Sequence, residues 1–139
     1  MRQAADLLRI ETPGRGLIEI TGQVAGWADA QHMATGLLTV FCRHTSASLL
    51  IQENAAAAVR QDLEAFFEQL APEDPDRYAH DDEGRDDMPA HLRTALTGVS
   101  LSIPVIEGRL RLGTWQGVYL FEHRRAPHHR ELALHLIGD

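Results

Sequence analysis

The sequence has no lysine, a single cysteine and no long apolar run, and each of these absences excludes a class of mechanism or site. Schiff-base catalysis and a P-loop both need a lysine amine, so neither is available. Cys42 alone cannot form a disulfide within the chain or a zinc site built on two or more cysteines. Any metal ion would therefore have to be held mainly by histidine and carboxylate side chains.

Charge and hydropathy narrow the choice of partner and location. The 139 residues carry 13 basic groups, all of them arginine, against 20 acidic ones, which gives a formal net charge of −7. Nucleic acids are bound through clustered cations, which this acidic chain lacks. No stretch approaches the roughly 18 apolar residues of a membrane-spanning helix, and the polar N-terminus does not resemble a signal peptide. We therefore expect no nucleic-acid partner, no membrane partner and a cytoplasmic location.

Hydrophobic periodicity predicts two helices and indicates a third within a single domain, residues 1–139. Apolar residues recur at helical spacing over 59–70, and Asn54 is a suitable N-cap for that helix. A second helix is predicted over 88–97, because an aspartate precedes it and a glycine follows it. A weaker helical pattern covers 21–32.

Most of the remaining chain is predicted to form strands. Continuous apolar runs at 36–42 and 117–121 are typical of buried strands, and alternation at 132–136 is typical of a strand with one wetter face. Residues 13–16 lie between two apolar segments and predict a hairpin turn. Six to eight strands are expected in all, and the helices do not alternate with them. This order favours an α+β fold with antiparallel sheets.

The segment 71–87 holds eight acidic residues and almost no large apolar side chain, so it is predicted to be a long surface loop. It contains His80 and leads to His91. These two histidines, together with His44 and the carboxylate of Asp82, could hold a metal ion and leave one position open for water or substrate. Alternatively, the loop is merely a solvated acidic segment whose charge favours the start of the next helix.

Three further groups of residues could bind a ligand. His44, Thr45 and Ser46 follow directly on a predicted buried strand, where they could orient a ligand or simply form a hydroxyl-stabilised turn. Trp115 and Gln116 lie between two glycines, where they could offer an apolar face and an amide to a ligand, or form a bulge with a buried tryptophan.

The third group is the densest positive patch of the chain, at residues 122–130. Arg124 and Arg130 could bind phosphate, because the planar guanidinium group matches two oxygens at once. Alternatively, this patch is a solvated turn with incidental charge. Glu122 lies in the same segment.

Four blocks of sequence, in this order, resemble the YjbQ-like family, whose members are also described as secondary thiamine-phosphate synthases. The blocks are FCRHTSASL at 41–49, QEN at 52–54, HDDEGRDDMPAH at 80–91 and LGTWQG at 112–117, followed by EHR at 122–124 and by Arg130. Four blocks in one order make the resemblance far more specific than any single block.

The resemblance implies a fold, an assembly and an activity. It implies β-sandwich-like sheets with helices packed against them, and a homotrimer with the site near the subunit contacts. It also implies a weak synthase activity that joins a pyrimidine methyl diphosphate to a thiazole phosphate and releases diphosphate. The site residues that it implies are His44, Thr45, Ser46, His80, Asp82, Asp86, His91, Trp115, Gln116, Glu122 and Arg130.

We assign these residues, with Arg124, to roles that the reaction requires. The catalytic residues are expected to be His44, His91, Asp86 and Glu122. The residues expected to bind substrate are Thr45, Ser46, Trp115, Gln116, Arg124 and Arg130. Histidine ligands favour zinc or another transition metal over Mg²⁺.

Two alternatives to the synthase remain open. One is a metal-dependent hydrolase of a phosphorylated small molecule, in which Asp86 or Glu122 acts as the base. The other is a non-catalytic trimeric protein that binds a metal ion or a metabolite.

Overall fold

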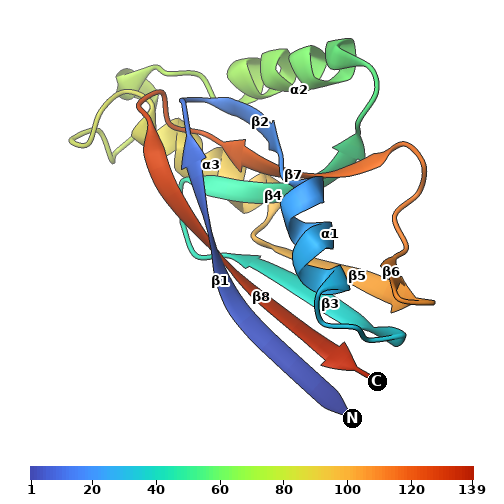
Figure 1. Ribbon diagram of the computed structural model, residues 1–139. Helices are drawn as coiled ribbons and strands as arrows, with labels where there is room; N and C mark the ends of the chain where they lie inside the picture. The colour runs from blue at the N-terminus through green and yellow to red at the C-terminus, as the bar shows by residue number, and fades with distance from the viewer.

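The computed structural model describes residues 1–139 and contains eight strands and three α-helices (Figure 1). In chain order the elements are β1 (Arg2–Thr12), β2 (Gly16–Glu19), α1 (Thr21–Asp29), β3 (Thr35–Cys42), β4 (Ala47–Glu53), α2 (Ala57–Leu70), a 3₁₀ turn (Pro75–Arg77), α3 (Asp87–Thr97), β5 (Ser100–Ile106), β6 (Arg109–Leu110), β7 (Gln116–Glu122) and β8 (His128–Gly138).

The strands form two antiparallel sheets. The larger sheet has the order β1-β8-β3-β5-β6, and the smaller sheet has the order β2-β7-β4. Every strand pair in both sheets is antiparallel. The predicted α+β fold with antiparallel sheets is confirmed.

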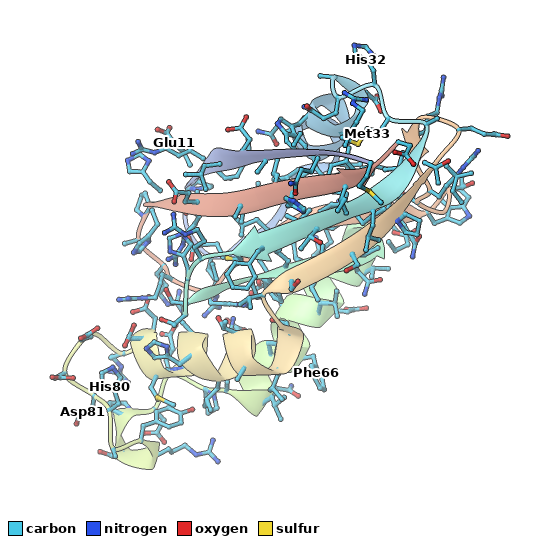
Figure 2. All side chains as sticks on the ribbon, turned by 90° about the horizontal axis from the view of Figure 1, so that it is seen from below. Glu11, His32, Met33, Phe66, His80 and Asp81 are labelled. Carbon is cyan, nitrogen blue, oxygen red and sulfur yellow. The ribbon has the colours of Figure 1, made fainter.

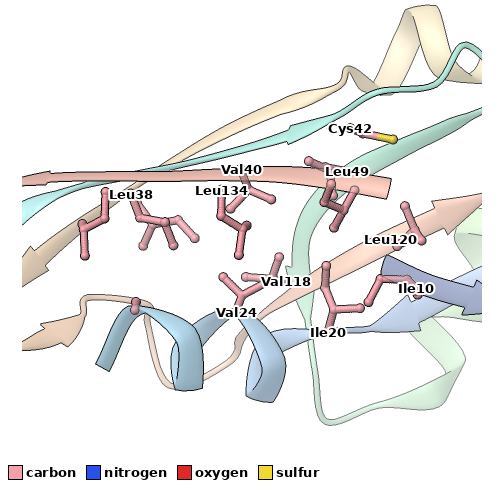
Figure 3. Packing of buried hydrophobic residues seen from close by; sticks show 14 of the residues in the cluster. Ile10, Ile20, Val24, Leu38, Val40, Cys42, Leu49, Val118, Leu120 and Leu134 are labelled. Carbon is pink, nitrogen blue, oxygen red and sulfur yellow. The ribbon is translucent and has the colours of Figure 1, made fainter. Parts of the chain in front are cut away.

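The hydrophobic core lies between the two sheets, with α1 beside the smaller one (Figure 3). Leu38 and Leu134 point inward from neighbouring strands of the larger sheet, while Val118 and Leu120 point inward from β7. Val24 of α1 completes this packing and is fully buried. The alternation of apolar residues that predicted the strands is therefore the alternation between the core and the opposite face of each sheet.

Helices α2 and α3 pack against the far face of the smaller sheet. The ring of Phe67 on α2 meets that of Phe121 on β7 edge to face, with centroids 5.6 Å apart. The ring of His123 lies 4.3 Å from that of Phe121, and its Nε2 is 2.9 Å from Oγ of Ser48 on β4. His123 is thus enclosed in the layer between the smaller sheet and the helices, with 1% of its surface exposed.

The predicted hairpin at 13–16 is wrong. Strand β1 pairs with β8 in the larger sheet, whereas β2 pairs with β7 in the smaller one, so this turn carries the chain from one sheet to the other. Gly14 has a φ of 148°, and a Cβ atom there would lie 2.7 Å from the carbonyl oxygen of Arg125. A glycine is required because two crossing segments meet at this point.

The predicted helices are close to those observed, except at the start of α2. Asn54 does not cap it, because its amide lies 3.5 Å from the carbonyl oxygens of Thr114 and Gln116. Helix α3 begins at Asp87, one residue earlier than expected, and ends before Gly98 as expected, and 71–86 forms a loop with one 3₁₀ turn. None of the helices has both the length and the apolar content needed to cross a membrane.

The outer face of the larger sheet is not covered by a helix (Figure 2). Leu37 and Ile137 are opposite each other on this face, and Phe41 is opposite Ala133, which in turn is opposite Leu7. All of these except the alanine are exposed large hydrophobic residues. The sheet therefore has one face in the core and one outer face, where large apolar side chains are exposed among polar ones and no other part of the chain covers them.

The burial of His123 predicts a pH-dependent stability. Burial, with the charges of Arg93 and Arg130, lowers its pKa from 6.5 to about 3. The unfolded chain therefore binds a proton near pH 6.5, whereas the folded chain does so only near pH 3. As far as His123 is concerned, the free energy of unfolding is highest above pH 6.5. It falls as the pH falls towards 3, by up to about 1.4 kcal/mol per pH unit.

Urea unfolding between pH 7 and pH 5 will measure this effect. His123→Gln keeps a polar group near Ser48 but does not titrate, so the free energy of unfolding of the variant should fall less steeply than that of the natural protein. Equal slopes for the two proteins would contradict the assignment.

Candidate functional site

A pocket of about 990 Å³ lies where the end of β3 and the turn before β4 face α3. Its polar lining consists of Arg43, His44, Thr45, Ser46, His91, Thr94 and Arg130, with Cys42 beside them. No aspartate or glutamate lines it. Its two arginines are each paired with a carboxylate outside the lining, Arg43 with Glu131 and Arg130 with Glu122, so the pocket wall offers guanidinium groups and no acid.

The back of this pocket is formed by a buried ion pair between Arg130 and Glu122. Nε and Nη2 of Arg130 donate to the two carboxylate oxygens of Glu122 over 2.7 and 2.5 Å. Thr12 donates its hydroxyl to the same carboxylate, and the two backbone N–H groups that follow Glu122 donate to it as well. Burial alone raises the pKa of Glu122, but these hydrogen bonds outweigh it and lower the pKa. Glu122 therefore positions Arg130, and it is poorly placed to act as the base to which it was assigned.

Arg130 keeps one nitrogen free for the pocket. Its Nη2 also donates to Oγ of Ser46 over 3.0 Å, whereas its Nη1 makes no hydrogen bond within the chain. Because Arg130 lines the pocket, Nη1 is available to an anionic ligand.

Beside the pocket, three groups converge at the start of α3. Nε2 of His80 lies 2.7 Å from Oδ2 of Asp87, and Nε2 of His91 lies 3.2 Å from the same oxygen. The three ligand atoms lie within 4.8 Å of one another. Helix α3 places Asp87 and His91 on one face, four residues apart, and the loop brings in His80, which Figure 2 shows at the tip of the fold. His91 also lines the pocket, so the two features adjoin.

The hydrogen bonds around this group fit a metal ion. Nδ1 of His91 is 3.0 Å from the carbonyl oxygen of Thr45 and must donate to it, which leaves Nε2 with a lone pair directed at the Asp87 carboxylate. Two acceptors facing each other require either a second proton on the ring or a cation. Ligating histidines are oriented in this same way, through the other ring nitrogen. The hydrogen bond to Asp87 raises the pKa of His80, so a metal ion would replace a proton there.

Arg124 and Asp86 hold Asp87 in place. Nη1 of Arg124 donates to Oδ1 of Asp87 over 2.9 Å, and its Nε donates to Oδ2 of Asp86 over 3.1 Å. Burial alone raises the pKa of Asp86, but hydrogen bonds from the Arg125 N–H group and from Arg124 lower it. Arg124, which was expected to bind phosphate, and Asp86, which was expected to be catalytic, are thus engaged with each other, and Arg124 also holds Asp87.

The structure does not bring His44 into the group of ligand atoms. Nε2 of His44 accepts a hydrogen bond of 2.8 Å from the N–H group of Glu131, and burial lowers the pKa of its ring. His44 is therefore neutral, and its lone pair is occupied. Oδ1 of Asp82 lies 3.4 Å from Nδ1 of His80, the nitrogen that faces away from Asp87. Asp87 thus stands where His44 was expected, while Asp82 forms a second, exposed group of possible ligands with His80 and Glu83.

Trp115 and Gln116 lie away from the pocket. They are at the start of β7, whereas Glu122 ends that strand, a separation of about 20 Å at 3.3 Å per residue. Trp115 is 63% exposed, so it forms no buried bulge, and Oε1 of Gln116 accepts a hydrogen bond from the N–H group of Gly113. One chain alone does not bring these two residues to the site.

Asp87 was one of the three loop carboxylates, with Asp82 and Asp86, that the sequence placed near the histidines, and it is the one that contacts both rings. Its position in the sequence predicts a helix cap, and it does open α3. The signal that could have identified it is the spacing Asp87-x-x-x-His91 at the first turn of a helix, because residues four apart share a face.

Comparisons with known proteins agree on one family. The model of the family described as "UPF0047 protein YjbQ-like" matches residues 6–139. A UPF0047 protein of Synechocystis is 53% identical over 138 residues, which cover 99% of this chain and 94% of that protein. The UPF0047 protein YjbQ of Escherichia coli O157:H7 is 41% identical, over 95% of this chain and 96% of that protein.

Solved structures show the same fold. A conserved hypothetical protein of Thermus thermophilus superposes with a TM-score of 0.79 at 37% identity, covering 95% of this chain and 99% of that one. A protein of unknown function from Sulfolobus solfataricus has a TM-score of 0.88 at 21% identity, covering 99% and 100% of the two chains. The latter likeness concerns the fold alone.

The geometry predicts which variants lose metal binding. Asp87→Asn and His91→Ala should weaken the binding of zinc to chelator-treated protein by at least about 100-fold, and Arg124→Met by about 10- to 100-fold, because it only orients a ligand. Isothermal titration with zinc measures each affinity. His44→Ala is the matched control: it alters a histidine of the same pocket and should leave zinc affinity unchanged. Loss of affinity in His44→Ala, with none in Asp87→Asn, would restore the ligand set expected from the sequence.

Proposed function

Because the chain belongs to the YjbQ-like UPF0047 family, we propose that it is a cytoplasmic enzyme that acts on a small phosphorylated metabolite beside a divalent transition-metal ion. Supporting this, His91 belongs both to the wall of the pocket and to the group of three ligand atoms. A donor set of two imidazoles and one carboxylate, with open positions, favours zinc or another transition metal over Mg²⁺.

The reaction that the family resemblance favours is the synthesis of thiamine phosphate. The bond between the methylene carbon of the pyrimidine and its diphosphate oxygen breaks, and the electron pair leaves with the diphosphate. The thiazole nitrogen then donates its lone pair to that carbon. No proton is transferred, so the reaction needs positive charge around the leaving group and does not need a base.

The donors that line the pocket support this reaction. Arg130 offers Nη1 to a phosphate oxygen, and Thr45 and Ser46 line the same wall. His44, which is neutral and already accepts a hydrogen bond at Nε2, keeps its Nδ1–H for donation. The absence of any carboxylate from the pocket lining is the observation that carries this choice. When bound, the metal ion supplies additional positive charge for the diphosphate oxygens.

A metal-dependent hydrolase is the second candidate. Two histidines and a carboxylate form the donor set of several zinc hydrolases, which supports it. Such an enzyme also needs a base for the attacking water. The two carboxylates considered for that role, Asp86 and Glu122, are held by arginines and have lowered pKa values. We therefore rank the hydrolase below the synthase, and a trimeric metal- or metabolite-binding protein without catalysis below both.

We further propose that the protein is a homotrimer in which the uncovered outer face of the larger sheet contacts a neighbouring subunit. Several large apolar side chains exposed together on one sheet face are typical of a subunit interface. Phe41 lies on this face and also lines the pocket, so a neighbouring chain would approach the site there. In such an assembly Trp115, which is distant from the pocket of its own chain, is free to contribute to that of a neighbour.

The synthase assignment predicts that the protein forms thiamine phosphate from the two substrates in the presence of zinc. Chromatography of the product measures the rate. His91→Ala and Arg130→Lys should each lower the rate by about 100-fold or more, because each removes or displaces charge at the leaving group. His128→Ala, which alters a histidine away from the pocket, should retain the rate. Release of phosphate without thiazole phosphate would favour the hydrolase, and unchanged turnover in both variants would refute a role for this pocket.

The assembly is tested by light scattering after size exclusion. The protein should have three times the 15.5 kDa mass of one chain. The double variant Leu37→Arg, Ile137→Arg places two charges on the outer sheet face and should dissociate it. Leu96→Arg introduces one such charge at an exposed position on α3 and should remain trimeric. A natural protein of 15.5 kDa in solution would rule out the trimer.

A further inference from the structure

The loop of residues 71–86 carries His80 to the metal site with little apolar packing of its own. None of its residues after Ala71 is buried, and the next buried residue is Asp87, at the start of α3. Apart from the contact of His80 with Asp87, no hydrogen bond joins residues 74–82 to the rest of the chain. The position of the loop therefore depends on polar contacts near its two ends.

Two adjacent arginines of the turn between β7 and β8 hold both ends of this loop. At its start, Nε of Arg125 donates to Oε1 of Glu73 over 2.6 Å. At its end, the backbone N–H group of Arg125 donates to Oδ2 of Asp86 over 2.8 Å. Nη2 of Arg124 donates to the carbonyl oxygen of Glu83 over 3.1 Å. Both ends of the loop are thus fastened to a single turn.

A second turn, at residues 13–16, holds the same carboxylate. Nη1 of Arg15 donates to Oε1 of Glu73 over 3.0 Å, so this oxygen accepts from two guanidinium groups. The two turns are in close contact, because a Cβ atom on Gly14 would lie 2.7 Å from the carbonyl oxygen of Arg125. The side chain of Arg15 is only 13% exposed, so water screens its pairing with Glu73 less than it screens a fully exposed pair. Glu73 therefore attaches the start of the loop to the body of the protein.

We propose that Glu73, together with Arg125, positions His80 to bind the metal ion; this inference rests on the metal site proposed above. His80 lies midway in the sequence between Glu73 and Asp87. Asp87 belongs to α3, whereas His80 reaches the site only while the loop is held in place. Metal affinity falls in proportion to the fraction of molecules whose loop is in the binding conformation. Glu73 and Arg125 are thus positioning residues, which orient a ligand without touching the ion.

Limited digestion of the full-length protein with trypsin, in chelator, tests the attachment of the loop without a metal ion. Glu73→Gln keeps the shape of the side chain but removes its charge. It should speed cleavage after Arg77 by about 10-fold, because proteolysis follows the population of the opened loop. Glu68→Gln is the matched control: it removes another carboxylate bonded to Arg15, but on α2, and should leave the rate unchanged. Equal cleavage rates in Glu73→Gln and the natural protein would overturn the proposal.

Isothermal titration with zinc tests whether this attachment acts through His80. Glu73→Gln should weaken zinc binding by about 10-fold, as expected for a residue that orients a ligand. In a His80→Ala background the same substitution should have no further effect, because the ligand that Glu73 positions is absent. An equal loss of affinity in both backgrounds would indicate a general structural effect and would refute the positioning role.

Arg125→Gln provides an independent variant. It removes the other side of the same contact and keeps the backbone N–H group that bonds to Asp86, so it should change both measurements in the same direction. Equal zinc affinities in Glu73→Gln and the natural protein would overturn the positioning role alone. If the natural protein binds no zinc, the positioning role is refuted together with the proposed metal site.

Discussion

The ion pair between Glu122 and Arg130 joins the two sheets at the end where the pocket lies. Glu122 ends β7 in the smaller sheet and Arg130 lies in β8 of the larger one, and both are almost completely buried. Thr12 adds β1 to this contact, and Ser46 adds the residue that precedes β4. Removing one member of such a pair costs about 3–5 kcal/mol, because the other charge is left buried and alone. The pair therefore fixes the packing of the sheets and, by the same contacts, leaves Nη1 of an arginine that lines the pocket without a partner in the chain.

Local sequence patterns predicted the elements of this fold better than their pairing. The spacing of apolar residues depends only on which side of a single helix or strand faces the core. The helices at 57–70 and 87–97 and the strand at 35–42 were therefore predictable from the sequence. The turn at 13–16 has the residues of a hairpin, but the chain there crosses between sheets, which only the tertiary contact of Gly14 reveals.

Strand β4 shows a different limit of sequence reasoning. Ser46, just before it, and Ser48 within it look like turn residues because they are polar. In the structure they are buried and satisfied, the first by Arg130 and the second by His123. A buried hydroxyl is tolerated when a partner meets it, and the partners come from β8 and from the segment after β7, which no local pattern indicates. The same reason explains why the sequence wrongly placed His44 among the metal ligands. Its Nε2 accepts a hydrogen bond from the N–H group of Glu131, which is far from it in the sequence.

The ion pairs beside the pocket depend on the shape of the arginine side chain, which a lysine could not replace. Arg130 binds both oxygens of Glu122 and still has Nη1 to offer, and Arg124 reaches Asp86 and Asp87 with separate nitrogens. A lysine ammonium is a single point charge and cannot span two carboxylate oxygens in a plane while presenting a third donor elsewhere. The acidic residues near the pocket are thus neutralised by arginines that retain donors of their own. A chain with an overall charge of −7 can in this way offer guanidinium donors in a pocket that no carboxylate lines.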